Sequence, residues 1–231
     1  DLGLAVIAAR YALPQADAEA AGRIADKFDT PISALEALGR RAAAVRIVAA
    51  EARLLRADLL CAFGARLKDH GLLNRAIEDA AAAGRKLNPD YEPLTWARAE
   101  MLRAQALTLF GELNGDVDAV ARAAATLTAA LEQLPRDHSP LDWARAQLAL
   151  ADTLQTLGEA CGDAHAFEQA VTCYDRANLV LRKMPAAPIH GVAAHARAAC
   201  LGRTAELVGD LAVLDAAEAA MKIQLGGAAQ A

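Results

Sequence analysis

Four aspartates recur at a constant spacing and are, by residue type, the side chains best suited to chemistry. They are Asp69, Asp116, Asp163 and Asp210, each 47 residues after the one before. Converging carboxylates can perform general acid–base catalysis or bind a metal ion. Each of these residues, however, precedes an apolar helical pattern, where aspartate caps the free N–H groups of the first turn and complements the helix dipole. Because successive helix pairs lie roughly 10 Å apart, we expect capping residues and no catalytic set.

Histidine and cysteine do not suggest a stronger site. His190 and His195 are five residues apart, which is a poor spacing for one helix face. Cys161 and His165 flank Asp163, but a metal site needs three or four converging ligands. We therefore predict a chain without metal, cofactor or catalytic residues, and not an enzyme. The cysteines show no CxxC spacing, so we expect reduced, partly buried thiols: Cys61, Cys161, Cys173 and Cys200.

Two tryptophans and one column of arginines remain as candidate binding residues. Trp96 and Trp143 could stack on a ligand, but both follow a Pro-Leu helix start, which favours packing between repeat units. The arginines stand at equivalent places in the repeat: Arg56, Arg103 and Arg197. In one interpretation they pair locally, as Arg103 would with Glu100 three residues earlier. In the other they form a strip that binds an acidic peptide. We favour pairing.

The composition is typical of packed helices. Hydrophobic residues make up 55% of the 231 residues, many of them alanine, and aromatics only 4%. Alanine is the best helix former, whereas sheets favour Val, Ile and Tyr. The net charge of −5 argues against general nucleic-acid binding, and no apolar run is long enough for a membrane span. The start at Asp1 lacks a Met and a basic leader, so we expect a piece of a longer chain. The reduced thiols lead us to expect a cytoplasmic protein.

A 47-residue repeat organises these features. The segment from Pro93 to Ala99 matches that from Pro140 to Ala146, including Pro, Leu, Trp, Ala and Arg. The same offset relates further columns: Ala57, Ala104, Ala151 and Ala198; Leu60, Leu107, Leu154 and Leu201; Leu73, Val120, Phe167 and Leu214; Ala76, Ala123, Ala170 and Ala217. A repeat of this length indicates stacked helix pairs.

Each unit is predicted to be two antiparallel helices. In the second unit they span 94–110 and 117–134, with Gly111 ending the first and Pro135 the second. The third unit is expected at 141–157 and 165–183, and the fourth at 189–204 and 211–225. Before them we predict helices at 2–13 and 15–28, divided by Pro14. From Ile32 to Leu67, after a start at Thr30-Pro31, we predict one long or kinked helix, because Gly39 is the only breaker.

The repeat resembles the tetratricopeptide family, and most of all a long-unit bacterial variety with a Pro-Leu-x-Trp-Ala start and a Gly-Glu-x-x-x-Gly-Asp turn. The family positions map in the third unit onto Ala151, Gly158, Ala170, Tyr174, Ala177 and Pro185, and in the second onto Ala104, Gly111, Ala123, Leu127, Ala130 and Pro135. The resemblance implies an all-α, right-handed α-solenoid of antiparallel helix pairs, with 10–11 helices. We assign 1–44 to an N-terminal helical region, a cap or degenerate repeat, 45–227 to four repeat units, and 228–231 to a frayed tail.

The family also implies where a partner binds, because its first helices line a concave groove. The corresponding residues here are Glu51, Asp58, Arg98, Met101, Gln105, Arg145, Asp152, Gln155, His195 and Arg203, together with Leu54 and Leu148. We therefore expect a scaffold or adaptor that binds another protein or peptide, with no nucleic acid and no membrane insertion. Two alternatives remain open: a small-ligand-binding or enzymatic module that uses a groove pocket, and a self-association module that forms homo-oligomers.

Overall fold

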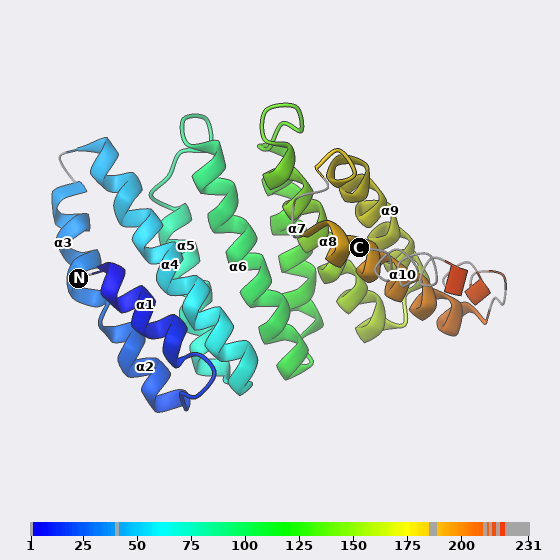
Figure 1. Cartoon of the computed structure of the whole chain (residues 1–231), viewed down its shortest axis with the longest axis horizontal. Coiled ribbons are helices and arrows are strands. Elements are labelled where there is room, and N and C mark those ends of the chain that lie inside the picture. The colour runs from blue at the N-terminus through cyan, green and yellow to red at the C-terminus, as the bar shows by residue number, and fades with distance from the viewer. Residues whose placement is uncertain are drawn as a thin grey trace. The chain divides into compact units, whose positions relative to one another are not determined.

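The described residues form helices joined by short turns. The computed structural model describes residues 2–39, 42–184 and 189–209, and beyond these Ala212, Leu214, Asp215, Glu218 and Ala219. The chain divides into two compact units, at 1–133 and 134–231. The expected all-α fold of sequential antiparallel helix pairs is confirmed for the described part (Figure 1). The second helix of the fourth repeat, expected at 211–225, lies largely outside the described residues, as does the tail at 228–231.

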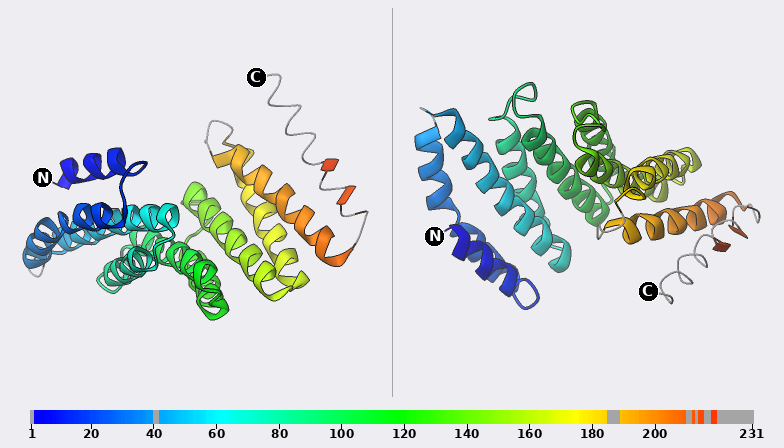
Figure 2. Two further views of the ribbon diagram at one scale, coloured as in Figure 1. Left: turned by 90° about the horizontal axis from the view of Figure 1, so that it is seen from below. Right: turned by 45° about the horizontal axis from the view of Figure 1, so that its top comes forward.

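The first unit holds seven of the described helices. They are α1 (Leu2–Ala12), α2 (Ala18–Asp26), α3 (Asp29–Gly39), α4 (Ala43–Leu67), α5 (His70–Gly84), α6 (Pro93–Asn114) and α7 (Val117–Glu132). Helix α4 packs against α3, α5 and α6, and α5 also packs against α6, so that α3, α4 and α6 follow one another with α5 behind them (Figure 1). Helix α1 lies apart from this row and packs on α2 and α4 (Figure 2).

The second unit repeats the pairing. Its described helices are α8 (Pro140–Cys161), α9 (Ala164–Leu181) and α10 (Ile189–Val208). Helix α9 packs against both α8 and α10. In the part of the chain that the structure describes, no helix has the length and hydropathy needed to cross a bilayer.

The alanine and leucine columns of the repeat form the core. Ala57, Ala104, Ala151 and Ala198 are fully buried, and so are the described second-helix alanines Ala76, Ala123 and Ala170. Alanine at these contacts lets neighbouring helix backbones approach closely, because its side chain is a single methyl group. Burying such apolar columns against the next helix stabilises the stack by roughly 25 cal/mol per Å² of apolar surface.

The aspartate column caps the second helices, as predicted. The side chain of Asp69 accepts a hydrogen bond from the Leu72 N–H at 2.9 Å. Asp116 accepts from Ala119, and Asp163 from His165, each also at 2.9 Å. The fourth member, Asp210, lies outside the described residues. The bonds satisfy donors that a helix start leaves unpaired, so these carboxylates have a structural role.

The prediction that Gly111 ends the first helix of the second unit is wrong, and so is the expected end at 157, before Gly158, in the third unit. Helices α6 and α8 continue past them to Gly115 and Gly162, which adopt φ values of +66° and +65° that favour glycine. A Cβ on Gly111 would lie 2.6 Å from Cγ2 of Val120, and one on Gly158 would lie 2.8 Å from Cδ2 of Phe167. These mid-helix glycines therefore allow the second helix to approach.

The single helix predicted over 32–67 is also wrong. Helix α3 ends at Gly39 and α4 begins at Ala43, so two helices replace one. A Cβ on Gly39 would lie 3.1 Å from the Cα of Arg46, which shows that the end of α3 is folded back close to the first turn of α4. The helix start expected at Thr30-Pro31 lies instead at Asp29. The other N-terminal helices match the prediction to within three residues.

Candidate functional site

The predicted groove residues of the first unit lie on α4 and α6. Glu51 of α4 and Arg98 of α6, which are 47 residues apart, form an ion pair with 3.5 Å between Nη1 and Oε1. Asp58 and Gln105 are exposed, and Met101 is half-buried. Equivalent positions of successive first helices are therefore neighbours here. Leu54, which was also assigned to this face, is buried in the core.

In the second unit the predicted residues lie on α8 and α10. Arg145 is exposed and pairs with Asp142 at 3.5 Å. The hydroxyl of Tyr174 on α9 donates a hydrogen bond to Asp152 at 2.5 Å. Other positions on this face are exposed or half-buried, except for buried Leu148: Gln155, His195 and Arg203. Tyr174 thus brings Asp152 together with Gln155, whose Oε1 lies 3.4 Å from the same hydroxyl.

The arginine column pairs with carboxylates, as favoured above. Arg103 donates to Glu100 at 3.1 Å, as the local-pairing interpretation predicts. Arg197 of α10 donates to Asp175 of α9 at 2.5 Å. Arg56 is only 8% exposed and donates from Nε and Nη2 to the two carboxylate oxygens of Asp79. Each of these arginines therefore pairs with a carboxylate of its own unit, and of the three Arg56 is the buried one.

Asp79 is the centre of a charged network that the sequence analysis missed. Besides the two hydrogen bonds from Arg56, Asp79 accepts a hydrogen bond from Arg53 at 2.9 Å. Arg56 also pairs with Asp29 of α3. The network ties α3, α4 and α5 together: its centre is buried, with Asp79 5% exposed, whereas Asp29 is exposed. Fork-shaped pairs of this kind are the strong hydrogen bonds of proteins.

The network continues to Glu36, at the edge of a pocket. Glu36 accepts from Nε of Arg53 at 2.6 Å and from Nζ of Lys86. The hydrogen bond from Arg53 lowers the pKa of Glu36 from its ordinary 4.5 to about 2, with a smaller contribution from Lys86, and burial only partly opposes it. Glu36 therefore carries its negative charge at neutral pH.

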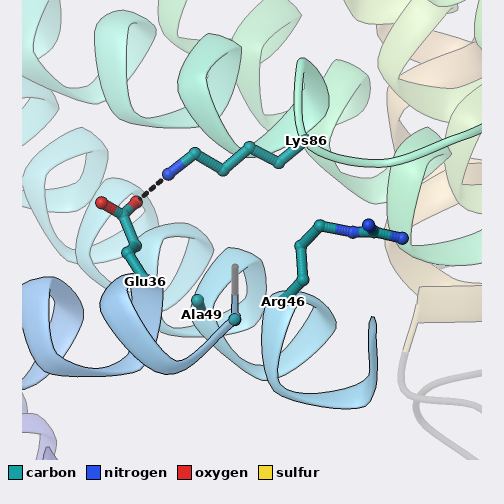
Figure 3. Close-up of a pocket in the computed structure, with 5 residues that line it drawn as sticks. Glu36, Arg46, Ala49 and Lys86 are labelled. Carbon is teal, nitrogen blue, oxygen red and sulfur yellow. Dashed lines mark hydrogen bonds and ion pairs between the residues drawn. The ribbon is translucent and has the colours of Figure 1, made fainter. Parts of the chain in front are cut away.

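The pocket lies between α3, α4 and the end of α5 and has a volume of about 240 Å³. The described residues that line it are Glu36, Gly39, Arg46, Ala49 and Lys86. Lys86 extends across it to Glu36, whereas the guanidinium of Arg46 points away from that pair, with Ala49 between them (Figure 3). The pocket thus has charged groups at its edges and small residues beneath.

The remaining candidates provide no reactive centre. All four cysteines are unpaired thiols, and Cys161 is exposed where we had expected partial burial. Burial raises the pKa of Cys61 to about 12, and that of Cys200 also to about 12, so both are protonated and unreactive at neutral pH. Trp96 packs against the core cluster between α4, α5 and α6, as expected. Within the described residues, no group of three metal-ligating side chains converges.

A signal for the missed network was present in the sequence. Asp79 is a carboxylate within an alanine-rich stretch, three residues after the buried Ala76, which places it on the buried face of α5. Arg53 and Arg56 share one face of α4 at a spacing of three residues. A carboxylate on a buried face needs such partners.

Comparisons with known proteins identify no family for this chain. No family profile matches the sequence. The curated proteins also contain no match. Two solved structures are similar at 16% sequence identity each. One, the DHF58 filament, has a TM-score of 0.44 over 79% of this chain and 93% of its own. The other is a circular tandem repeat protein with novel repeat topology and enhanced subunit contact surfaces; its TM-score is 0.45 over 97% of this chain and 57% of its own.

Proposed function

We propose that the chain is a tetratricopeptide-like scaffold that binds another protein along the face formed by the first helix of each pair. The observation that carries this proposal is the ion pair between Glu51 and Arg98. These residues occupy the same position in consecutive repeats, so their contact makes one surface out of α4 and α6. A surface built from equivalent positions offers an extended partner a regular series of contacts.

The composition of this surface in the first unit suits a protein partner. Val48 and Leu55 lie on the same face of α4 as Glu51, and they are 52% and 37% exposed. Leu94 on α6 is 42% exposed. Protein interfaces combine apolar contacts with charged groups that set orientation.

In each unit, the first helices carry exposed charges of both signs. Asp58 and Asp152 are exposed carboxylates, and Arg98, Arg145 and Arg203 are exposed arginines. Such a mixture favours a partner segment that itself carries both acidic and basic residues. Charge complementarity of this kind contributes more to specificity and association rate than to affinity.

Charge reversal tests the proposal. A displayed peptide library is selected on the wild-type protein, and the affinities of the selected peptides are measured by calorimetry. We expect the double variant Arg98→Glu/Arg145→Glu to bind these peptides at least tenfold more weakly, because it replaces attraction by repulsion on the first-helix face.

The matched control is Arg122→Glu/Arg176→Glu, which reverses two exposed arginines on the second helices α7 and α9. It changes the net charge by the same amount and should leave the affinities within about twofold, since exposed charges at a distance are screened. Equal losses in both double variants, or no loss in the first, would refute the assignment of the binding face.

A further inference from the structure

The exposed side of α4 forms a stripe that differs from the rest of the first-helix face. Its residues follow one another at alternating intervals of four and three, and all are exposed or half-buried: Ala44, Val48, Glu51, Leu55, Asp58 and Ala62. This spacing places them along one side of the helix. Two helices that pack alongside each other use the same spacing for their contacts. The stripe therefore has the geometry to bind one further helix.

The apolar part of the stripe does not follow from the repeat. Val48 is 52% exposed and Leu55 is 37% exposed. The residues at the equivalent positions of α6 and α8 are all half-buried, and two of them are polar: Thr95, Leu102, Asp142 and Ala149. Exposed apolar groups that lie together mark interaction sites. Burial of Val48 and Leu55 against apolar side chains of a partner would be favourable.

The charge of the stripe is also particular to α4. Where α4 has Glu51, the equivalent residues of α6 and α8 are Arg98 and Arg145. Glu51 pairs with Arg98 at 3.5 Å, so its charge is compensated within the face. Asp58 is exposed and forms no ion pair with another described residue. In the described part of the chain, this negative charge of the stripe is therefore left without a cation.

The arginines of α4 do not supply that cation. Two of them donate to Asp79 of α5, and all four have partners outside the stripe: Arg46, Arg53, Arg56 and Arg66. The helix thus keeps its positive charges bound within the unit and presents apolar groups and a carboxylate to solvent. Such a surface is complementary to a helix that carries apolar residues and a basic residue on one face.

We propose that the stripe of α4 binds an amphipathic helix of the partner protein. This helix places large apolar side chains at the levels of Val48 and Leu55 and a lysine or arginine at the level of Asp58. At the level of Glu51 it carries an uncharged polar residue, because Glu51 already pairs with Arg98. The inference rests on the proposed function and specifies the partner of the face in the first unit.

The spacing in the stripe sets the pattern of the partner helix. The levels of Val48, Glu51, Leu55 and Asp58 are separated by three, four and three residues. A parallel helix therefore carries apolar, uncharged polar, apolar and basic residues at positions i, i+3, i+7 and i+10. An antiparallel helix carries the same residues in reverse order.

Binding of alanine-rich helical peptides to the full chain tests the stripe, with fluorescence anisotropy as the measurement. The first peptide carries Leu, Gln, Leu and Lys at these four positions, and the second has them in reverse order. We expect saturable binding of at least one of the two. Replacing its lysine by glutamate should weaken binding at least fivefold, because attraction to Asp58 becomes repulsion. Moving its leucines to the opposite face should weaken binding at least tenfold.

Asp58→Lys tests the charge assignment. We expect this variant to bind the glutamate peptide more tightly than the lysine peptide, which reverses the preference of the wild type. The matched control is Glu78→Lys, which makes the same change of charge at an exposed residue of α5 and should keep the wild-type preference. A general loss of structure cannot reverse a preference, and circular dichroism verifies that both variants are folded.

Three results would overturn the inference: no saturable binding of either peptide, equal binding of the peptide with displaced leucines, or an unchanged preference in Asp58→Lys. The proposed function would survive them if peptides selected from the library bound the wild type and lost affinity in Arg98→Glu/Arg145→Glu. If the selected peptides also kept their affinity for that double variant, the proposed binding face would be refuted as well.

Discussion

At the scale of single residues, the carboxylate of Asp79 connects two arginine side chains in the first unit. It is 5% exposed and receives hydrogen bonds from Arg53 and Arg56, which are themselves partly or fully buried. Removing it would take away both hydrogen bonds that the Nε and Nη2 groups of Arg56 donate, and would leave the buried Arg56 with only the exposed Asp29 as its partner. Uncompensated buried charge is among the most destabilising changes known for proteins.

We therefore expect Asp79→Ala to lower the free energy of unfolding by about 3–5 kcal/mol. Urea denaturation followed by circular dichroism measures the change. The matched control is Asp26→Ala, which removes the exposed partner of Arg75 and should cost at most about 1 kcal/mol. If both substitutions had the same small effect, the network would not contribute to stability as its burial indicates.

At the scale of the helix pair, glycine sets how closely the two helices approach. Gly64, Gly111 and Gly158 stand 47 residues apart and face Leu73, Val120 and Phe167 of the following helix. The sequence pattern singled out Gly111 but assigned it to a helix end. Helix termination depends on local conformation, whereas close approach depends on the partner helix, which no local pattern reveals.

Gly111→Ala should destabilise the protein by about 1–3 kcal/mol, because the new Cβ would overlap Val120 and the backbone carbonyl of Asp116. Gly202→Ala in α10 is the control. No described atom lies within 4 Å of a Cβ there, so the better helix propensity of alanine should stabilise by roughly 0.5–1 kcal/mol. Thermal denaturation distinguishes the expected loss of stability from the expected gain. Stabilisation by Gly111→Ala would contradict a close approach of α7 at this glycine.

At the scale of the whole molecule, the 47-residue period runs through both compact units. Lys68, Gly115, Gly162 and Gly209 all adopt a left-handed backbone, with φ between +52° and +71°. The same turn geometry thus recurs four times within the described residues, although each unit holds only part of the series. Lys68 is the exception by residue type, since a side chain disfavours this conformation.

Lys68→Gly should raise the free energy of unfolding by about 1 kcal/mol, because glycine adopts this conformation without the steric cost of a Cβ. The reverse change at the equivalent position, Gly115→Lys, should lower it by a similar amount. Urea denaturation of the two variants tests whether the free energy of unfolding rises in the first and falls in the second. A loss of stability in Lys68→Gly would show that the positive φ of Lys68 carries no such strain.

The sequence by itself determined the helical class, the period of 47 residues, the capping aspartates and the residues of the buried alanine columns. These features depend on interactions within one or two turns of helix, or on periodicity that can be read along the chain. Only the tertiary structure decided which charges meet, such as Asp79 with Arg53 and Arg56 or Glu36 with Lys86. Those contacts join residues 17 to 50 positions apart, so they depend on how closely packed helices approach one another.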